Sequence, residues 1–169
     1  MHLLRSNLLA VVLLCITVTS CSKEDPAETA GTPYDIDLAL AQKNDSQLSS
    51  EILSLVNAHR TSIGLSALTI DTQYTTAYAV DHTQYMIEQE KISHDNFGYR
   101  SEGIKFHKDA EVVGENVAYG YNTAEDLVNA WLNSPGHKDV IEGDYTHTGF
   151  GVMQSDKGRY YFTQLFYRK

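Results

Sequence analysis

The stretch that decides the fold is EDLVNAWLNSPGHKDVIEGDYTHTGFGV, from Glu125 to Val152. It begins with a helical pattern, because four apolar side chains fall on one face: Leu127, Val128, Trp131 and Leu132. The preceding Thr123-x-x-Asp126 is a variant of the capping box, and Pro135 is expected to stop the helix. The stretch therefore predicts a helix, a Pro-Gly break that carries His137, and then a strand.

Two further polar clusters lie upstream, Gly114-Glu115-Asn116 and Ser93-His94-Asp95. Like His137, His94 is flanked by turn residues, which project a side chain from a loop into a cavity. Together the three clusters predict a site assembled from three loops.

Histidine and carboxylate dominate the candidate chemistry. The common sequence motifs of serine nucleophiles, metalloproteases and nucleotide-binding loops are absent from the chain. Two neutral imidazoles with one or two oxygen ligands suit zinc or another divalent ion and leave a position open for water. We therefore predict His94, His137 and Glu115 as metal ligands, with Glu115 alternatively acting as a general base. Three dispersed residues of these types also occur together by chance in many proteins.

The first twenty residues have the features of a secretory signal. One arginine, Arg5, precedes an apolar run that is shorter than the roughly twenty residues of a membrane span. Val18-Thr19-Ser20-Cys21 resembles the lipobox of bacterial lipoproteins, in which the cysteine becomes the lipidated first residue. We expect residues 1–20 to be a lipoprotein signal peptide and Cys21 to anchor the chain to a membrane. The alternative is ordinary cleavage that leaves Cys21 as a free thiol.

Residues 21–47 are polar and show no sustained period, which is typical of a flexible tether. For Tyr34 to Leu40, packing against the domain is an equally compatible interpretation. Residues 48–169 form the expected domain. Loss of Arg5 with the signal takes the formal charge from −9 to −10, and this acidic balance disfavours nucleic acid as a partner.

The periodicity along the domain predicts an α+β fold. One helix is expected from Ser49, with Ser49 or Ser50 as its cap and Gly64 just past its end, and a second from Asp71. No period persists between Glu90 and Tyr121, where we expect loops and short strands. The C-terminal period of two predicts a hairpin of Thr148–Met153 and Tyr160–Tyr167. Helices first and strands last are typical of an α+β layered domain.

Six short runs resemble, in order, the motifs of a CAP domain, the superfamily of cysteine-rich secretory proteins, antigen 5 and pathogenesis-related proteins. The resemblance extends from about Ser49 to Tyr167 and is to the disulfide-free, SCP-like extracellular branch of bacteria. It implies an α-β-α sandwich with an antiparallel sheet between helical layers. The runs are Leu55-Val56-Asn57-Ala58-His59-Arg60, Ser93-His94, Gly114-Glu115-Asn116-Val117, Trp131-Leu132-Asn133-Ser134-Pro135-Gly136-His137, Gly149-Phe150-Gly151-Val152 and Tyr161-Phe162-Thr163-Gln164.

The resemblance also implies a surface cleft lined by two histidines and two acidic residues. His94, Glu115 and His137 fall on three of these four positions. The fourth acid follows the tryptophan of the third helix by three residues in the eukaryotic pattern, and here that position is Ser134. No motif supports Asp139 or Glu142 as a substitute. A metal site with one carboxylate can still form, whereas a mechanism that needs both acids lacks one.

Other residues of these motifs are expected to be structural: His59, Arg60, Asn116, Trp131 and Gln164. Arg60 should pair with a carboxylate or with loop carbonyls, and Gln164 should satisfy backbone groups near the cleft. Tyr119 and Tyr121, beside the Gly-Glu-Asn cluster, are candidate ligand contacts.

Three functions stay open at this level. The first is an envelope-anchored binding module whose cleft takes a small apolar molecule, a glycan or a protein, with or without a divalent ion. The second is a zinc-dependent hydrolase or peptidase with Glu115 as its base, which the missing fourth acid disfavours. The third is a structural or adhesive envelope protein with a vestigial cleft. Ser22 after Cys21 resembles lipoproteins sent to an outer membrane, where the cell has one, so the domain would face the periplasm or the exterior.

Overall fold

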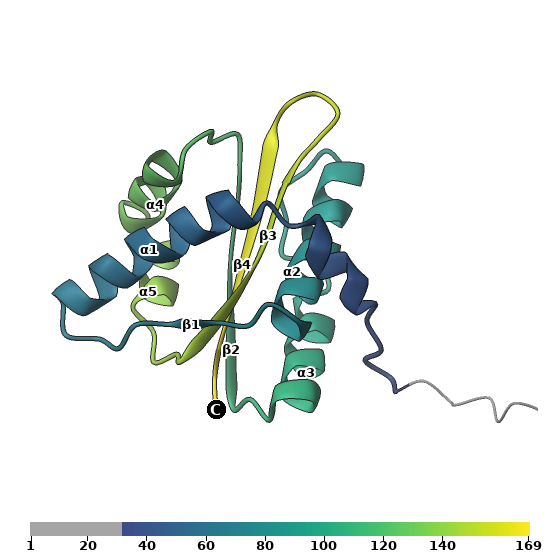
Figure 1. Cartoon of the computed structure of the whole chain (residues 1–169), viewed down its shortest axis with the longest axis horizontal. Helices are drawn as coiled ribbons and strands as arrows, with labels where there is room; N and C mark the ends of the chain where they lie inside the picture. The colour runs from purple at the N-terminus through teal and green to yellow at the C-terminus, as the bar shows by residue number, and fades with distance from the viewer. Residues whose placement is uncertain (1–31) are drawn as a thin grey trace, which may run out of the picture. The chain divides into compact units, whose positions relative to one another are not determined.

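The computed structural model describes residues 32–169, so the expected signal peptide and Cys21 lie outside the described residues. Figure 1 shows a β-sheet between two groups of helices, α1, α4 and α5 on one face and α2 and α3 on the other. This arrangement confirms the expected α+β sandwich. The elements are the 3-10 helix η1 (Leu38–Lys43), α1 (Ser46–Ser62), β1 (Thr69–Ile70), α2 (Tyr74–Glu88), α3 (Phe97–Lys108), β2 (Val112–Tyr119), α4 (Ala124–Leu132), α5 (Pro135–Ile141), β3 (His147–Gln154) and β4 (Tyr160–Arg168).

The sheet has the strand order β1-β3-β4-β2. β4 pairs antiparallel with β3, as the predicted hairpin requires. β4 also pairs antiparallel with β2 on its other side. The expectation of a wholly antiparallel sheet is wrong in one place, because β1 pairs parallel with β3. β1 has two residues, Thr69 and Ile70, too few to give a periodic signal. The order leaves β2 as an edge strand, which matters for the site below.

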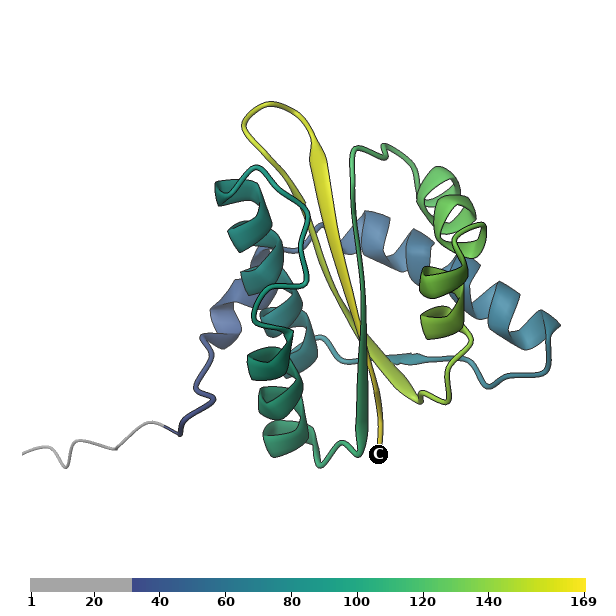
Figure 2. The same cartoon turned by 180° about the vertical axis from the view of Figure 1, so that it is seen from behind.

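Each face of the sheet has its own apolar core. On the first face, side chains of α1 and α4 pack on Phe150, Phe162 and Phe166 of the hairpin. Figure 2 shows these helices and the hairpin from behind. On the second face, Tyr78 of α2 and Ile104 of α3 pack on the alternate residues of β4. Successive residues of β4 therefore serve opposite cores, as the period of two requires.

The structure places a helix where the sequence predicted loops, between Glu90 and Tyr121. α3 buries only Arg100, Gly103 and Ile104, so its buried stripe holds a single apolar residue that a hydrophobic pattern can register. Gly98 and Gly103 also lower its intrinsic helix propensity. Gly103 is needed because the hydroxyl of Tyr78 lies 2.2 Å from where a Cβ would stand. Tertiary packing therefore decides this helix.

Helix boundaries follow local capping chemistry. Asp45, and neither Ser49 nor Ser50, caps α1 by accepting a hydrogen bond from the Leu48 amide, and Gly64 follows its end with φ of 86°. The second helix begins at Tyr74, three residues later than expected, because the Asp71 side chain caps the turn before it. Pro135 ends α4 as predicted but also starts α5 as its first residue.

Residues 32–45, which precede α1, lie against the domain. The carbonyl of Tyr34 accepts a hydrogen bond from the hydroxyl of Tyr78, and the side chain of Asn44 accepts one from the Val152 amide at 2.8 Å. These contacts agree with the packed interpretation of Tyr34 to Leu40. The described end of the expected 21–47 tether is thus part of the folded unit, because the Tyr34 carbonyl is bound from α2 and α3 and the Asn44 side chain is bound from β3.

Arg60 joins the end of α1 to two loops. It is 1% exposed, and its guanidinium donates to four carbonyl oxygens, those of Ser66, Ile141, Gly143 and Tyr145, at 2.6–3.0 Å. Loop carbonyls are the second of the two partner types expected from the sequence. A planar guanidinium satisfies four acceptors in fixed directions, which a lysine ammonium cannot do.

Replacement of Arg60 by alanine should lower the free energy of unfolding by about 3 kcal/mol or more, because four buried carbonyls lose their donor. Arg60→Lys should recover less than half of this loss. Chemical denaturation with an unchanged m-value measures both. A loss below about 1 kcal/mol for Arg60→Ala would show that water replaces the guanidinium.

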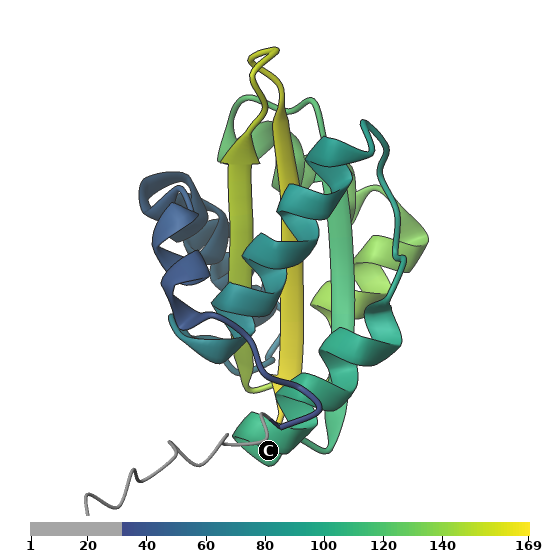
Figure 3. The ribbon, with the colours of Figure 1, turned by 90° about the vertical axis from the view of Figure 1, so that its right-hand side faces the viewer.

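α2 crosses the face of the sheet, as Figure 3 shows. Its backbone lies very close to Gly151 of β3. A Cβ on Gly151 would stand 2.2 Å from the carbonyl oxygen of Ala79, which belongs to the α2 backbone and cannot move aside. Thr83 of α2 exploits this approach by donating to the carbonyl of Gly151 at 2.9 Å.

Gly151→Ala should therefore destabilise the fold by about 2 kcal/mol or more, since the helix must shift away from the sheet. Gly98→Ala is the matched control, because its Cβ would meet nothing within 4 Å and alanine favours a helix. Thermal unfolding should show a lower Tm for the first variant and an equal or higher Tm for the second. Equal effects would refute the close-approach argument.

Candidate functional site

The candidate site lies at the free edge of β2. Glu115 and Asn116 are neighbours on this strand and point to opposite faces of the sheet, Glu115 toward α3 and Asn116 toward α5. A cavity of about 280 Å³ at this edge is lined by His94, Glu115, Asn116, Ser134, Gly136, His137 and Val140. The structure thus brings His94, Glu115 and His137 together, but from a loop, a strand and a short helix, where the sequence predicted three loops.

Glu115 is held by Arg100, which the sequence analysis did not identify. The Arg100 guanidinium donates to both carboxylate oxygens of Glu115, at 2.8 and 2.9 Å, and the two side chains are 3% and 2% exposed. His94 Nδ1–H donates to the same carboxylate at 2.7 Å. Burial lowers the pKa of Arg100, and the charge of Glu115 opposes that shift. The result is a buried ion pair with one imidazole on its outer side.

The loop that carries His94 is fixed from α2. His82 Nε2–H donates to the carbonyl of Ser93 at 2.8 Å, and the hydroxyl of Tyr85 donates to Asp95 at 3.1 Å. Burial lowers the pKa of His82, with the charge of Arg100 as the second cause, which favours this neutral, donating form. Arg100 also donates to the carbonyl of Asp95 at 2.6 Å. The sequence analysis did not single out His82, because no local motif marks its contact with this loop.

His137 is held on the opposite wall. Its Nδ1 shares a hydrogen bond of 2.8 Å with the hydroxyl of Ser134, and its backbone carbonyl accepts from the Asn116 side chain at 3.0 Å. Burial lowers the pKa of His137, and the neighbouring His94 lowers it further. The serine that stands where the resemblance implied an acid therefore orients a histidine that is neutral at pH 7.

An apolar cavity of about 220 Å³ continues from His137 along β2. It shares Ser134 and His137 with the histidine cavity and is otherwise lined by Ile92, Val117, Ala118, Tyr119, Tyr121, Ala130 and Trp131. Both tyrosines proposed as ligand contacts lie here. Tyr119 is 44% exposed and its ring stacks on Tyr161. The site thus has a polar end and an apolar end.

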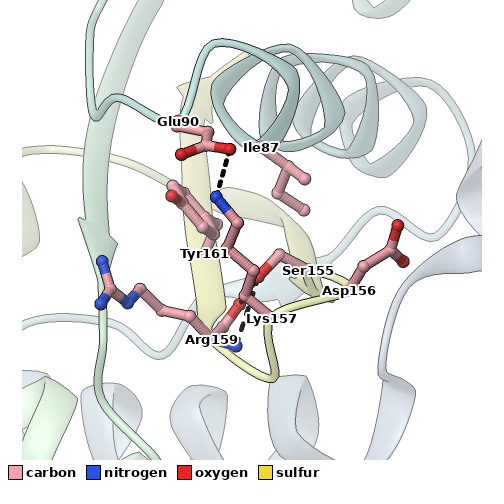
Figure 4. Close-up of a pocket in the computed structure, with 7 residues that line it drawn as sticks. All are labelled: Ile87, Glu90, Ser155, Asp156, Lys157, Arg159 and Tyr161. Atoms are coloured by element: carbon pink, nitrogen blue, oxygen red, sulfur yellow. Dashed lines mark hydrogen bonds and ion pairs between the residues drawn. The ribbon is translucent and has the colours of Figure 1, made fainter.

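A separate hollow of about 330 Å³ lies at the turn between β3 and β4 (Figure 4). Lys157 pairs there with Glu90 across the opening, and Arg159 reaches over the ring of Tyr119 at 5.4 Å from the ring centre. It contains no histidine. This hollow borders the apolar cavity through Tyr119 and Tyr161 without sharing the polar end.

The geometry does not fit a three-ligand metal site. Among residues 32–169, no three His, Cys, Asp or Glu side chains converge in a way that could hold an ion. Both oxygens of Glu115 are already bound by Arg100, which leaves His94 and His137 as the remaining donors. Neither Asp139 nor Glu142 lines the cavity, so neither replaces the missing fourth acid. Glu142 instead pairs with His59 at 2.8 Å. Divalent metal binding stays a prediction.

Two of the residues expected to be structural, Trp131 and Gln164, are buried. Trp131 is 2% exposed and its indole N–H donates to the carbonyl of Val117 at 3.5 Å. Gln164 is fully buried, and its amide donates to the hydroxyl of Thr148 at 3.2 Å, where backbone groups had been expected. Its carbonyl oxygen has no partner within the described residues.

Removal of one partner from the Arg100–Glu115 pair should cost more stability than removal of both. Arg100→Met leaves a buried carboxylate unpaired and should lower the free energy of unfolding by about 3 kcal/mol or more. Arg100→Met combined with Glu115→Leu should recover much of this loss. Denaturant unfolding of the two single variants and the double variant measures the coupling. Additive losses would show that the two charges do not interact.

Two curated proteins of Bacillus subtilis are similar to this chain. It is 38% identical to the uncharacterized membrane protein YlbC over 123 residues, which cover 70% of this chain and 34% of YlbC. It is 32% identical to the uncharacterized protein YkwD over 123 residues, which cover 68% of this chain and 46% of YkwD. The chain thus spans less than half the length of these relatives.

Two solved structures superpose on this chain and share its fold. An outer surface protein from Borrelia burgdorferi superposes with a TM-score of 0.66 at 25% identity, over 73% of this chain and 94% of that one. An extracellular protein with an SCP domain from Bacillus anthracis superposes with a TM-score of 0.59 at 30% identity, over 71% of this chain and 40% of that one.

The sequence profile of the cysteine-rich secretory protein family, CAP, matches residues 53–166, which include α3, the cleft and all of β2 and β3. This range agrees with the extent of the motifs from Leu55 to Gln164 and with the observed sandwich. The chain belongs to the CAP family.

Proposed function

We propose that this protein is an envelope-anchored CAP domain that binds a small molecule with an apolar body and one polar group. The observation that carries the proposal is the continuity of the two cavities at the edge of β2, which share Ser134 and His137. One end offers imidazole and hydroxyl groups, and the other offers aromatic and aliphatic walls. Small-molecule sites have this composition, mostly apolar with a few placed polar groups.

The polar end can recognise a hydroxyl or carbonyl group. His94 uses Nδ1 as a donor to Glu115, so in a neutral ring Nε2 is an acceptor. The lowered pKa of His137 keeps that ring neutral at pH 7. A ligand would therefore meet a neutral imidazole at His137, and the charge of Glu115 is matched by Arg100.

The hydrolase alternative has no observation in its favour. A general base must be free to take a proton from water, but both oxygens of Glu115 accept hydrogen bonds from Arg100, and one also accepts from His94. The remaining alternatives are a glycan or protein ligand and a structural protein with a vestigial cleft, and the test below distinguishes an apolar ligand from these three.

The location that we propose is the outer face of a membrane, with Cys21 as the lipid anchor. None of the helices within residues 32–169 has the length and apolar character needed to cross a bilayer. The similarity to an outer surface protein, an extracellular protein and a membrane protein supports an envelope setting.

Trp131 provides a built-in reporter for ligand binding. It is the only tryptophan in the chain, and it lines the apolar cavity. Dibromostearic acid, an apolar acid whose bromines quench indole fluorescence, should quench Trp131 in a saturable way. Tyr121→Ala should weaken the fitted affinity about tenfold, or about 1.4 kcal/mol, because a ring that would contact the ligand is lost.

Ile63→Ser is the matched control, because Ile63 is 49% exposed and lines neither cavity. Its affinity should equal that of the unchanged protein. Absence of saturable quenching would contradict the proposal for apolar ligands and favour the glycan, protein or vestigial alternatives. Repeating the titration with zinc chloride, and with His94→Ala and His137→Ala, tests whether a divalent ion binds at the polar end.

A further inference from the structure

An exposed aromatic patch lies on α3, away from the histidines. Tyr99 and Phe106 are 41% and 53% exposed, which is unusual for large apolar side chains. They are seven residues apart, so both lie on one face of the helix. The ring of Tyr34, from the segment before η1, lies between them, 6.0 Å from Tyr99 and 5.9 Å from Phe106. We call these three residues the aromatic patch.

The patch lies where the chain enters the domain. The Tyr34 carbonyl accepts hydrogen bonds from the hydroxyl of Tyr78 and from His107 Nε2–H, the latter at 2.9 Å. The hydroxyl of Tyr99 donates to the carbonyl of Asp35 at 3.2 Å. Side chains of α2 and α3 thus hold the backbone beside Tyr34 at this point of the surface. Whatever precedes residue 32 must leave the domain next to these rings.

Both lysines beside the patch are paired with carboxylates. Lys105 pairs with Glu102 at 2.8 Å and Lys108 pairs with Asp71 at 3.2 Å, so neither cation is unmatched. Asp35, Asp37, Asp95 and Asp109 are further exposed charged groups near these rings in sequence, and all four are acidic. Anionic lipid would therefore not be attracted to the patch, and its aromatic area has to supply the binding to a neutral lipid surface.

The length of chain before the patch limits how far it can be from the proposed anchor. Ten residues lie between Cys21 and Thr32. Such a segment spans at most about 40 Å when fully extended and about 18 Å as a flexible coil. A membrane surface at that distance acts on the patch at a millimolar effective concentration. Weak interfacial affinity is then sufficient to dock the domain.

We propose that Tyr34, Tyr99 and Phe106 form a membrane-interface patch that docks the domain on the lipid surface to which it is tethered. The inference rests on the proposed anchoring through Cys21. Tyrosine rings with one apolar body and one polar end are suited to the headgroup region of a bilayer, and long lysine stems beside them can extend to the same level. A second weak contact is also what a lipid-anchored protein needs for stable attachment in one orientation.

A second copy of the chain is a less suitable occupant. A stable dimer buries about 800 Å² on each partner, and three side chains on one helix face fall well short of that area. Docking through α3 also has a consequence for the cleft. Arg100, which holds Glu115, precedes Phe106 by six residues, or about 9 Å along the helix axis. The histidine cleft would then lie close to the lipid surface.

The test uses the full chain, acylated in a bacterial host and reconstituted in phosphatidylcholine vesicles that carry bromine on the acyl chains. Phe106→Trp places an indole in the patch, and Ile63→Trp places one at a similarly exposed position just after the end of α1. Trp131 is buried and contributes the same background to both. Bromolipid should quench the indole at position 106 at least twofold and leave the indole at position 63 unchanged. Equal accessibility of both indoles to aqueous acrylamide, with no bromolipid quenching, would overturn the proposal.

Vesicle flotation distinguishes failure of the anchoring through Cys21 from failure of docking by the aromatic patch. If the unchanged chain fails to float with vesicles, or floats equally well as Cys21→Ser, the proposed anchoring fails. If it floats through Cys21 while the indole at position 106 stays in water, the patch inference alone fails. Tyr99→Ser should reduce bromolipid quenching of the Phe106→Trp chain without loss of flotation. A concentration-dependent dimer of Cys21→Ser that Tyr99→Ser abolishes would assign the patch to self-association and refute membrane docking.

Discussion

The interaction on which the site depends is the buried ion pair between Arg100 and Glu115. An edge strand exposes one side of its backbone, and a carboxylate placed there would ordinarily turn to water. Arg100 holds both oxygens of Glu115 at the edge of β2 and also binds the carbonyl of Asp95. One guanidinium therefore connects α3, the edge strand and the loop of His94. Without it, the two walls of the cleft would have no shared support on this face.

The same edge explains why the cleft has two chemical ends. β2 alternates its side chains, so Glu115 serves the α3 side and Asn116 the α5 side. Beyond them the strand runs under Trp131 and the two tyrosines, where the lining is apolar. Ser134 contacts both ends and orients His137 in place of an acid. Loss of a carboxylate at this position makes the cleft less charged, which suits binding better than proton transfer.

The sequence predicted those features that short local motifs mark. The capping of α4 by Thr123, the β3–β4 hairpin and the grouping of His94, Glu115 and His137 follow from short motifs. It missed α3, because a helix buried through Arg100, Gly103 and Ile104 has no continuous apolar stripe. It also missed the role of His82, because its bond to Ser93 joins segments whose relation the sequence does not show.

The sequence by itself indicated the family, the α+β class and three residues that line the cleft, because short motifs that resemble those of the CAP family carry that information locally. The tertiary structure decided that Glu115 is matched by Arg100, that Ser134 bonds His137 and that Tyr34 lies between two exposed rings of α3. These are contacts between side chains on different elements. Their partners are chosen by packing of helices on the sheet, which no local pattern encodes.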